Sequence, residues 1–207
     1  MPPYKKFPKL DKRLKVDVVI LGGGIVGITA AKLLKEAGHA VAIIKEDRIV
    51  KGVTLRTTAK ISMGPSLIYN KLILILGQSK AQEFANSSIK AVEKVADIIR
   101  KQRIDCEFHR LPLYIYNESD EKVDELKSEF EATKKLGLPV PYTEKAPLSF
   151  KTGPAIKYEN QPQFHSRKHL LALSEDIVGE SSYIFERTSA IIVKYVKING
   201  VFADKGS

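Results

Sequence analysis

A glycine-rich turn between an apolar run and an amphipathic segment constrains the fold of this chain more than any other feature. Residues 16–21 read VDVVIL, an almost continuous apolar run that is typical of a parallel strand covered on both faces. GGGIVG follows at 22–27, and apolar residues then recur at helical spacing up to Gly38, where we expect the helix to end. The run AVAII at 40–44 predicts a second buried strand. Strand, helix and strand within about thirty residues make a βαβ unit.

The glycine spacing predicts a site for an adenine dinucleotide. Gly22, Gly24 and Gly27 occupy the pattern G-x-G-x-x-G, in which the first glycine permits a tight turn, the second admits a pyrophosphate and the third allows close helix packing. The helix N-terminus adds free N–H groups and partial positive charge. Ile28 stands where a P-loop needs its lysine, so that class of phosphate site is excluded. The expected contact residues are Gly22, Gly23, Gly24, Ile25, Val26 and Gly27.

The end of the second predicted strand leaves the identity of the nucleotide open. In this pattern an acid about 20 residues beyond the glycines binds the ribose hydroxyls. Lys45 lies 18 residues and Glu46 lies 19 residues after Gly27. One hypothesis turns Glu46 to the ribose, and the other points Lys45 at a 2′-phosphate, as in NADP, although Arg is the usual residue there. We favour Glu46, with Lys45 as a solvent-facing residue at the strand end.

Composition and scattered motifs argue against several other functions. The net charge is +10, but the lysines alternate with acids, as in KSEFEATKK, so we expect a solvated surface in preference to a nucleic-acid partner. Cys106 is the only cysteine, which excludes a cysteine-based zinc or iron–sulfur site within this chain. His165 and His169 share a helix face without a third ligand, so no metal site is expected. No apolar run approaches the roughly 20 residues of a membrane span, and the N-terminus lacks an apolar signal region, so we expect a cytoplasmic protein.

The segment FPKLDKRLKVDVVILGGGIVGITAAKLLKEAGHAVAIIKEDRIVKGVTLRTTAKIS, residues 7–62, resembles the N-terminus of the FAD-dependent oxidoreductases of the D-amino-acid oxidase and glycine oxidase type. It is most similar to the subgroup that often carries a C-terminal Rieske domain. Weaker similarity continues through RIDCEFHRLPLYIY and NQPQFHSRKHLLAL. The family's ribose-binding acid aligns with Lys45, which is a departure from its pattern.

The resemblance implies FAD as the cofactor, with its pyrophosphate on residues 22–27. It also implies that TLRTTAK, residues 54–60, lies beside the flavin, with Thr57, Thr58, Ala59 and Lys60 as cofactor-binding residues. A lysine near a flavin can stabilise negative charge at the ring. The implied reaction transfers hydride from an amine or a similar reduced carbon of a small-molecule substrate to the flavin. No catalytic base is identifiable from the sequence.

We therefore predict an α/β protein with a Rossmann-like FAD/NAD(P)-binding βαβ unit and an inserted α+β subdomain of the substrate-binding type. The expected divisions are an N-terminal arm at 1–15, the nucleotide-binding βαβ unit with the flavin loop at 16–78, the insertion at 79–180 and a return strand with a hairpin at 181–207. Only SYIFE supplies a further strand for the parallel sheet, so we expect the chain to stop before that sheet is complete.

The incomplete sheet leaves four functions to be distinguished. The favoured function is an FAD-dependent oxidoreductase present as its N-terminal portion. A non-catalytic dinucleotide-binding fragment, dependent on a separate chain for the missing C-terminal half, is the first alternative. An NADP-dependent enzyme that uses Lys45 and a basic nucleic-acid binder are the weaker alternatives.

Overall fold

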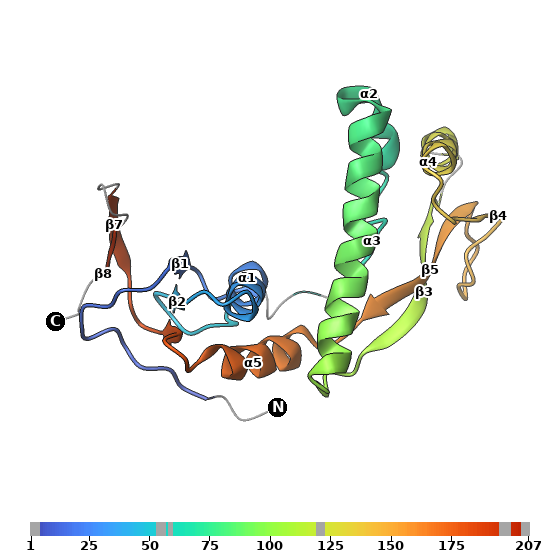
Figure 1. Ribbon diagram of the computed structural model, residues 1–207. Coiled ribbons are helices and arrows are strands. Elements are labelled where there is room, and N and C mark those ends of the chain that lie inside the picture. Colours follow the sequence, from blue (N-terminus) through green and yellow to red (C-terminus); the bar gives the residue numbers. More distant parts are fainter. Residues whose placement is uncertain (1–4, 53–56, 58–59, 119–122, 195–199, 204–207) are drawn as a thin grey trace. The chain divides into compact units, whose positions relative to one another are not determined.

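The computed structural model describes residues 5–52, 57, 60–118, 123–194 and 200–203 (Figure 1). The chain forms two compact units. The first unit comprises Met1–Thr58, Ile104–Cys106 and His165–Ser207, and the second comprises Ala59–Arg103 and Glu107–Phe164. The second unit therefore begins and ends earlier in the chain than the insertion that the sequence predicted at 79–180.

Two sets of contacts explain where the units divide. Ile61 N donates to the Pro162 carbonyl over 2.9 Å, which ties the segment before residue 79 to a strand of the second unit. At the other end, the helix that follows His165 packs against the first helix of the chain and therefore belongs to the first unit. Both contacts join residues more than a hundred positions apart, which local sequence patterns do not record.

The first unit is built on a parallel sheet. Its elements in chain order are β1 (Val18–Leu21), α1 (Ile25–Glu36), β2 (Val41–Ile44), α5 (Ser166–Ile177), β6 (Tyr183–Phe185), β7 (Ala190–Lys194) and β8 (Gly200–Ala203). The strand order is β1-β2-β6, both pairs are parallel, and β7 and β8 form a separate antiparallel pair. Helices α1 and α5 lie side by side (Figure 1). This arrangement confirms the predicted βαβ unit and the predicted return strand.

The two predicted buried strands differ in their surroundings. All four residues of β2 are buried, because β2 lies between β1 and β6. Strand β1 was expected to be covered on both faces, but it is only half-buried and Leu21 at its end is 51% exposed. The reason is its position, since β2 is the only strand that pairs with β1 among the described residues.

The N-terminal arm is fixed to the segment after β6 by two buried polar residues. Glu186 accepts hydrogen bonds from Phe7 N at 3.3 Å and from Ile49 N at 2.7 Å, and Thr188 Oγ1 accepts one from Leu10 N at 3.1 Å. Glu186 is 3% exposed and Thr188 is 1% exposed. Buried polar groups need such partners, so these two side chains hold together the arm, the loop after β2 and the third strand.

The second unit combines an antiparallel sheet with three helices. Its elements in chain order are α2 (Tyr69–Leu76), α3 (Gln78–Lys101), β3 (His109–Tyr116), α4 (Val123–Lys135), β4 (Tyr142–Thr143) and β5 (Ala155–Gln163). Strand β5 lies between β3 and β4. The core of the unit gathers apolar residues from α2, α3, α4 and β5 around Tyr69 and Tyr158, which are both fully buried. The predicted α+β character of this part of the chain is therefore confirmed.

A buried carboxylate organises the start of α2. Glu129 on α4 is fully buried and accepts hydrogen bonds from the backbone N–H groups of Ile68, Tyr69 and Asn70, with N···O distances of 2.8 to 2.9 Å. The first N–H groups of a helix have no partners within the helix, and a negative charge there is favourable. Glu129 thus supplies from a distant helix the cap that α2 lacks in its own sequence.

We expect Glu129→Ala to lower the free energy of unfolding by about 3 kcal/mol, because three backbone donors lose a charged acceptor. The measurement is urea unfolding followed by circular dichroism. Glu131→Ala is the matched control, since Glu131 lies on the same helix and forms an exposed pair with Lys134, a kind of contact worth about 0.5 kcal/mol. Equal losses in the two variants would contradict the capping role.

Candidate cofactor site

The first and third glycines of the turn, Gly22 and Gly27, have the geometry that the sequence pattern predicted for them. Gly22 has φ +123°, a conformation that favours glycine, and no atom of the described residues lies within 4 Å of a Cβ placed there. A Cβ on Gly27 would lie 2.1 Å from the Gly22 carbonyl oxygen. The first glycine therefore makes the turn, and the third allows α1 to pack directly against the end of β1.

The loop that follows β2 covers one side of the turn. Val50 N donates to the Gly23 carbonyl over 2.7 Å, and a Cβ on Gly23 would lie 2.5 Å from Cγ2 of Ile49. Ile49 and Val50 are each 2% exposed. The sequence predicted cofactor contact for Gly23 but gave no signal that Ile49 packs against it, because the two positions are distant in the chain.

The start of α1 offers its N–H groups to a ligand. Gly24 is the N-cap residue, and α1 has no side-chain cap among the described residues and no acid in its first turn. Ile25 and Val26 are 45% and 79% exposed. An uncapped, uncharged and accessible helix start beside an open Gly22 fits the diphosphate of a dinucleotide.

The end of β2 lies next to this turn. Gly22 N donates to the Ile44 carbonyl over 2.9 Å, so the two residues after Ile44 are close to the glycines. The backbone of Lys45 is held from both sides, because its N–H donates to Phe185 O and its carbonyl accepts from Thr188 N. Lys45 is half-buried and Glu46 is exposed.

Asp47, the second acid after β2, is already engaged. Its carboxylate pairs with Lys51 Nζ, and that hydrogen bond holds the pKa of Asp47 below its usual value. No partner of the Glu46 side chain is found in the part of the chain that the structure describes. Of the two acids, Asp47 is therefore held by Lys51 within the loop, whereas Glu46 is exposed.

The predicted flavin segment falls on the division between the units. Thr57 is exposed and belongs to the first unit, whereas Lys60 is exposed and belongs to the second. Thr58 and Ala59 lie outside the described residues. Within the first unit the structure thus brings together residues 22–27 with Lys45 and Glu46. Within the second unit Lys60 forms an antiparallel bridge with Gln163.

Residues just beyond Lys60 are fixed by a side chain that the sequence did not single out. Gln161 is 6% exposed, its Oε1 accepts from Met63 N at 3.0 Å, and its Nε2 donates to the Glu159 carbonyl over 2.5 Å. Gly64 packs against Tyr158, because a Cβ at Gly64 would lie 2.2 Å from the tyrosine ring. The base of the predicted flavin segment is therefore anchored to β5 within the second unit.

The histidines serve the structure of α5. His165 is the N-cap residue, with its Nδ1 accepting from Lys168 N over 3.4 Å. His169 is 2% exposed, and burial lowers its pKa to about 4. Cys106 is also buried. Within the described ranges, no group of three or more His, Cys, Asp or Glu side chains could hold a metal ion.

A sequence profile of the DAO family, described as FAD dependent oxidoreductase, matches residues 17–206. The chain belongs to this family. The resemblance seen in the sequence is therefore confirmed, and so is FAD as the cofactor of the family. The chain is 33% identical over 188 residues to the putative Rieske 2Fe-2S iron-sulfur protein YhfW of Bacillus subtilis (strain 168), an alignment that covers 91% of this chain and 37% of that protein.

Solved structures of oxidoreductases share the family fold. L-amino acid deaminase from Proteus vulgaris matches 99% of this chain and 47% of its own chain, with a TM-score of 0.71 and 18% identity. Glycine oxidase from Bacillus cereus ATCC 14579 matches 93% of this chain and 54% of its own, with a TM-score of 0.68 and 18% identity. The family member described here thus spans about half the length of these structures and corresponds to their N-terminal portion.

No helix among the described residues of this family member is both long enough and apolar enough to cross a bilayer.

We expect Gly27→Ala to lower the free energy of unfolding by at least about 2 kcal/mol, because the added methyl group would collide with the Gly22 carbonyl. Alanine within a helix is otherwise more favourable than glycine by roughly 1 kcal/mol, so a loss of stability in Gly27→Ala indicates the collision and a gain indicates its absence. Val26→Ala is the control, since Val26 is 79% exposed in the same turn. A Gly27→Ala protein as stable as the parent in urea would contradict the close approach.

His169 predicts a pH dependence of stability. The unfolded chain binds a proton near pH 6.5 but the folded chain only near pH 4, so this contribution is complete above pH 6.5 and is lost as the pH falls toward 4. Between pH 7 and pH 5, the wild-type protein should lose roughly 2 kcal/mol more than His169→Gln. His39→Gln, which removes an exposed histidine, is the control in the same urea titrations. Parallel pH profiles for wild type and His169→Gln would contradict the effect.

Proposed function

We propose that this chain is the FAD-binding N-terminal portion of an amine or amino-acid oxidoreductase, with the diphosphate of FAD at residues 22–27. The observation that carries the proposal is the open space at Gly22 beside the uncapped start of α1. The first turn of α1 carries no acid, and the adjacent Gly22 and Gly24 have no side chains, so a ligand with two negative phosphates can approach the backbone there.

Each residue of the proposed site has a separate task. The N–H groups at the start of α1 bind the diphosphate, and the absence of a first-turn acid favours its negative charge. Glu46 accepts hydrogen bonds from the ribose hydroxyls. Thr57 and Lys60 contact the flavin half, where the lysine ammonium stabilises negative charge on the ring. When bound, FAD supplies the hydride acceptor, and the protein supplies binding, orientation and electrostatics.

The substrate class follows from the relatives. Glycine oxidase and L-amino acid deaminase, as their names state, act on amino acids, and both share the fold of this chain. We place an amine or amino acid as the small-molecule substrate of the complete enzyme. The second unit, with its antiparallel β3-β5-β4 sheet, is the part of this chain that we assign to substrate binding.

A further polypeptide segment is the proposed partner of the first unit. Strand β1 pairs with a single strand among the described residues, and Leu21 at its end is 51% exposed. An apolar residue on a half-paired strand favours the addition of another strand. The proposed source is the remaining half of the oxidoreductase, on the same or a separate chain. The cytoplasmic location of the protein stays a prediction.

Flavin binding tests the proposal through a charge placed at the helix start. The purified chain should bind FAD, giving flavin absorbance near 450 nm in the protein fraction. Val26→Glu should weaken FAD binding by about tenfold or more, because a carboxylate there repels the diphosphate, yet it should not destabilise α1, because an acid favours a helix start. Val26→Gln is the matched neutral control. Fluorescence quenching of added FAD measures the affinity, and urea unfolding measures the stability.

Two outcomes of the FAD titration, and one outcome of a separate NADP titration, distinguish the alternatives. Wild-type protein that binds no FAD would favour the alternative of a fragment that depends on a partner chain. Equal FAD affinity of the Val26→Glu and Val26→Gln proteins would place the diphosphate elsewhere. Lys45, half-buried at the end of β2, keeps the NADP alternative open, and a preference for NADP over FAD that is lost in Lys45→Ala would support it.

A further inference from the structure

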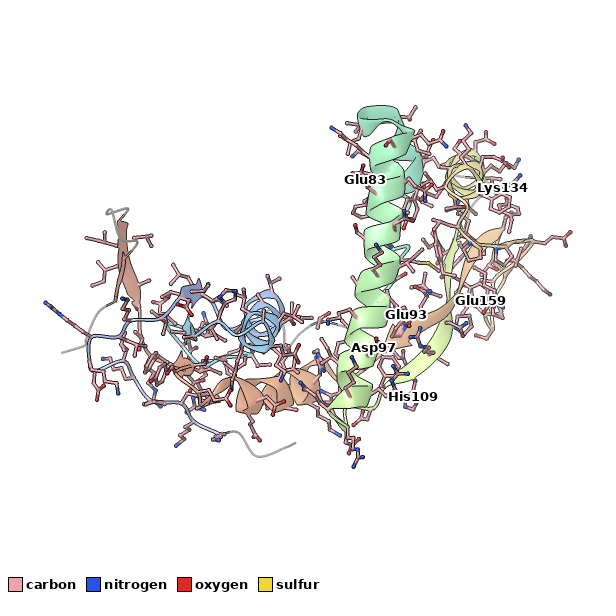
Figure 2. All side chains as sticks on the ribbon, in the orientation of Figure 1. Glu83, Glu93, Asp97, His109, Lys134 and Glu159 are labelled. Atoms are coloured by element: carbon pink, nitrogen blue, oxygen red, sulfur yellow. The ribbon has the colours of Figure 1, made fainter. Side chains whose placement is uncertain are left out.

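We propose that Glu186 is a positioning residue of the nucleotide site, whose carboxylate holds the loop after β2 against the glycine turn. This role rests on the proposed function, because it concerns the turn to which we assign the diphosphate of FAD. Glu186 directly follows β6 and is 3% exposed. Glu129 and Glu186 are the only buried carboxylates among the residues that the structure describes. By contrast, Glu83 and Glu93 on α3 are exposed (Figure 2).

The two oxygens of the Glu186 carboxylate hold different segments of the first unit. Oε1 accepts a hydrogen bond from Ile49 N over 2.7 Å, and Oε2 accepts one from Phe7 N over 3.3 Å. The backbone N–H of Glu186 donates to the Pro8 carbonyl over 3.0 Å, so the N-terminal arm binds both the backbone and the side chain of this residue. A hydrogen bond to an ionised group is about twice as strong as a neutral one. The bond to Ile49 therefore fixes the path of the loop after β2.

Ile49 and Val50 transmit this position to the glycine turn. Ile49 is 2% exposed, and a Cβ on Gly23 would lie 2.5 Å from its Cγ2. Val50 N donates to the Gly23 carbonyl over 2.7 Å. Val50 takes φ +55°, which is an outlier for a β-branched residue and persists only where its surroundings hold it. The adjacent bond between Ile49 N and Glu186 supplies part of that support.

The peptide bond between Gly23 and Gly24 carries the effect to the side of the turn where a ligand can bind. A planar trans peptide points its C=O and its N–H in opposite directions. Since the Gly23 carbonyl faces Val50 N, the Gly24 N–H faces away from the loop after β2. No hydrogen bond of the Gly24 N–H is found within the described part of the chain. The contact with Val50 thus orients an N–H group that is available to the diphosphate.

The start of the same loop is held without the Glu186 carboxylate. Lys45 N donates to the Phe185 carbonyl, and the Lys45 carbonyl accepts from Thr188 N. Loss of the carboxylate should therefore release Ile49 and Val50 while β2 and β6 stay paired. A turn that is no longer held must be ordered when the ligand binds, which lowers the affinity.

Substitutions at Glu186 test the role through FAD binding by the 207-residue chain, measured by fluorescence quenching. Glu186→Leu removes both acceptor oxygens and should weaken FAD binding about tenfold or more. Glu186→Gln keeps one acceptor oxygen for Ile49 N and should restore the affinity to within about threefold of the wild type. Thr188→Val is the matched control, because Thr188 is 1% exposed and binds the same arm at Leu10. It should lower the stability and leave the FAD affinity unchanged.

Amide NMR signals of the isotope-labelled chain without FAD test the position of the turn directly. Glu186→Leu should shift the Gly24 amide signal, and Thr188→Val should not. If Glu186→Leu fails to fold, Ile49→Ala removes the side chain that meets Gly23, and it should shift the same signal and weaken FAD binding severalfold.

The role would be overturned by an unchanged Gly24 signal or an unchanged FAD affinity in a folded Glu186→Leu or Ile49→Ala protein. It would also be overturned if Glu186→Gln bound FAD as weakly as Glu186→Leu, or if Thr188→Val lost as much affinity. Wild-type protein that binds no FAD would overturn the proposed function, and the role of Glu186 in FAD binding with it. Failure of the role alone differs, since the wild type then binds FAD and the variants bind it equally well.

Discussion

The close approach of α1 to the end of β1 is the constraint on which the nucleotide-binding unit depends. It requires glycine at position 27, because a methyl group would collide with the Gly22 carbonyl 2.1 Å away. This close approach also places the first turn of α1 just beyond the end of β1 and next to the end of β2. A single absent side chain thus sets the packing of the helix, and with it the position of the helix start to which we assign the diphosphate.

Two buried polar side chains with several hydrogen bonds each organise the second unit. Glu129 caps α2 from α4, and Gln161 anchors the residues after Lys60 to β5. Apolar residues at these positions would avoid the cost of burying polar atoms. Polar residues instead specify one path for the connecting segments, because each has a fixed set of partners.

A feature of the structure was predictable from the sequence when the residues that form it lie close together in the chain. The βαβ unit and the return strand β6 were predictable, because hydrophobic spacing and glycine positions record local structure. The family was predictable from the motif-rich first sixty residues, and the profile match confirms it. The roles given to Lys45, Glu46, Thr57 and Lys60 stay predictions.

Contacts between distant segments could not be predicted in this way. Glu129 meets the start of α2 across about sixty residues, and the register shift between Leu111 and Leu113 requires knowing which strand pairs with β3. The packing of Ile49 against Gly23 and the edge position of β1 could not be predicted from local patterns either. In each case the sequence shows the residue type but not its partner, and the partner decides the function of the residue.

The bond between Glu186 and the N-terminal arm has a consequence for how the chain folds as it is made. Phe7 and Glu186 are 179 positions apart, so this bond can form only after residue 186 has left the ribosome. The second unit is built almost entirely from one continuous stretch and can fold while the first is still incomplete. Such an order leaves β1 and β2 without their third strand during synthesis, which is the interval in which chaperones protect unpaired strand edges.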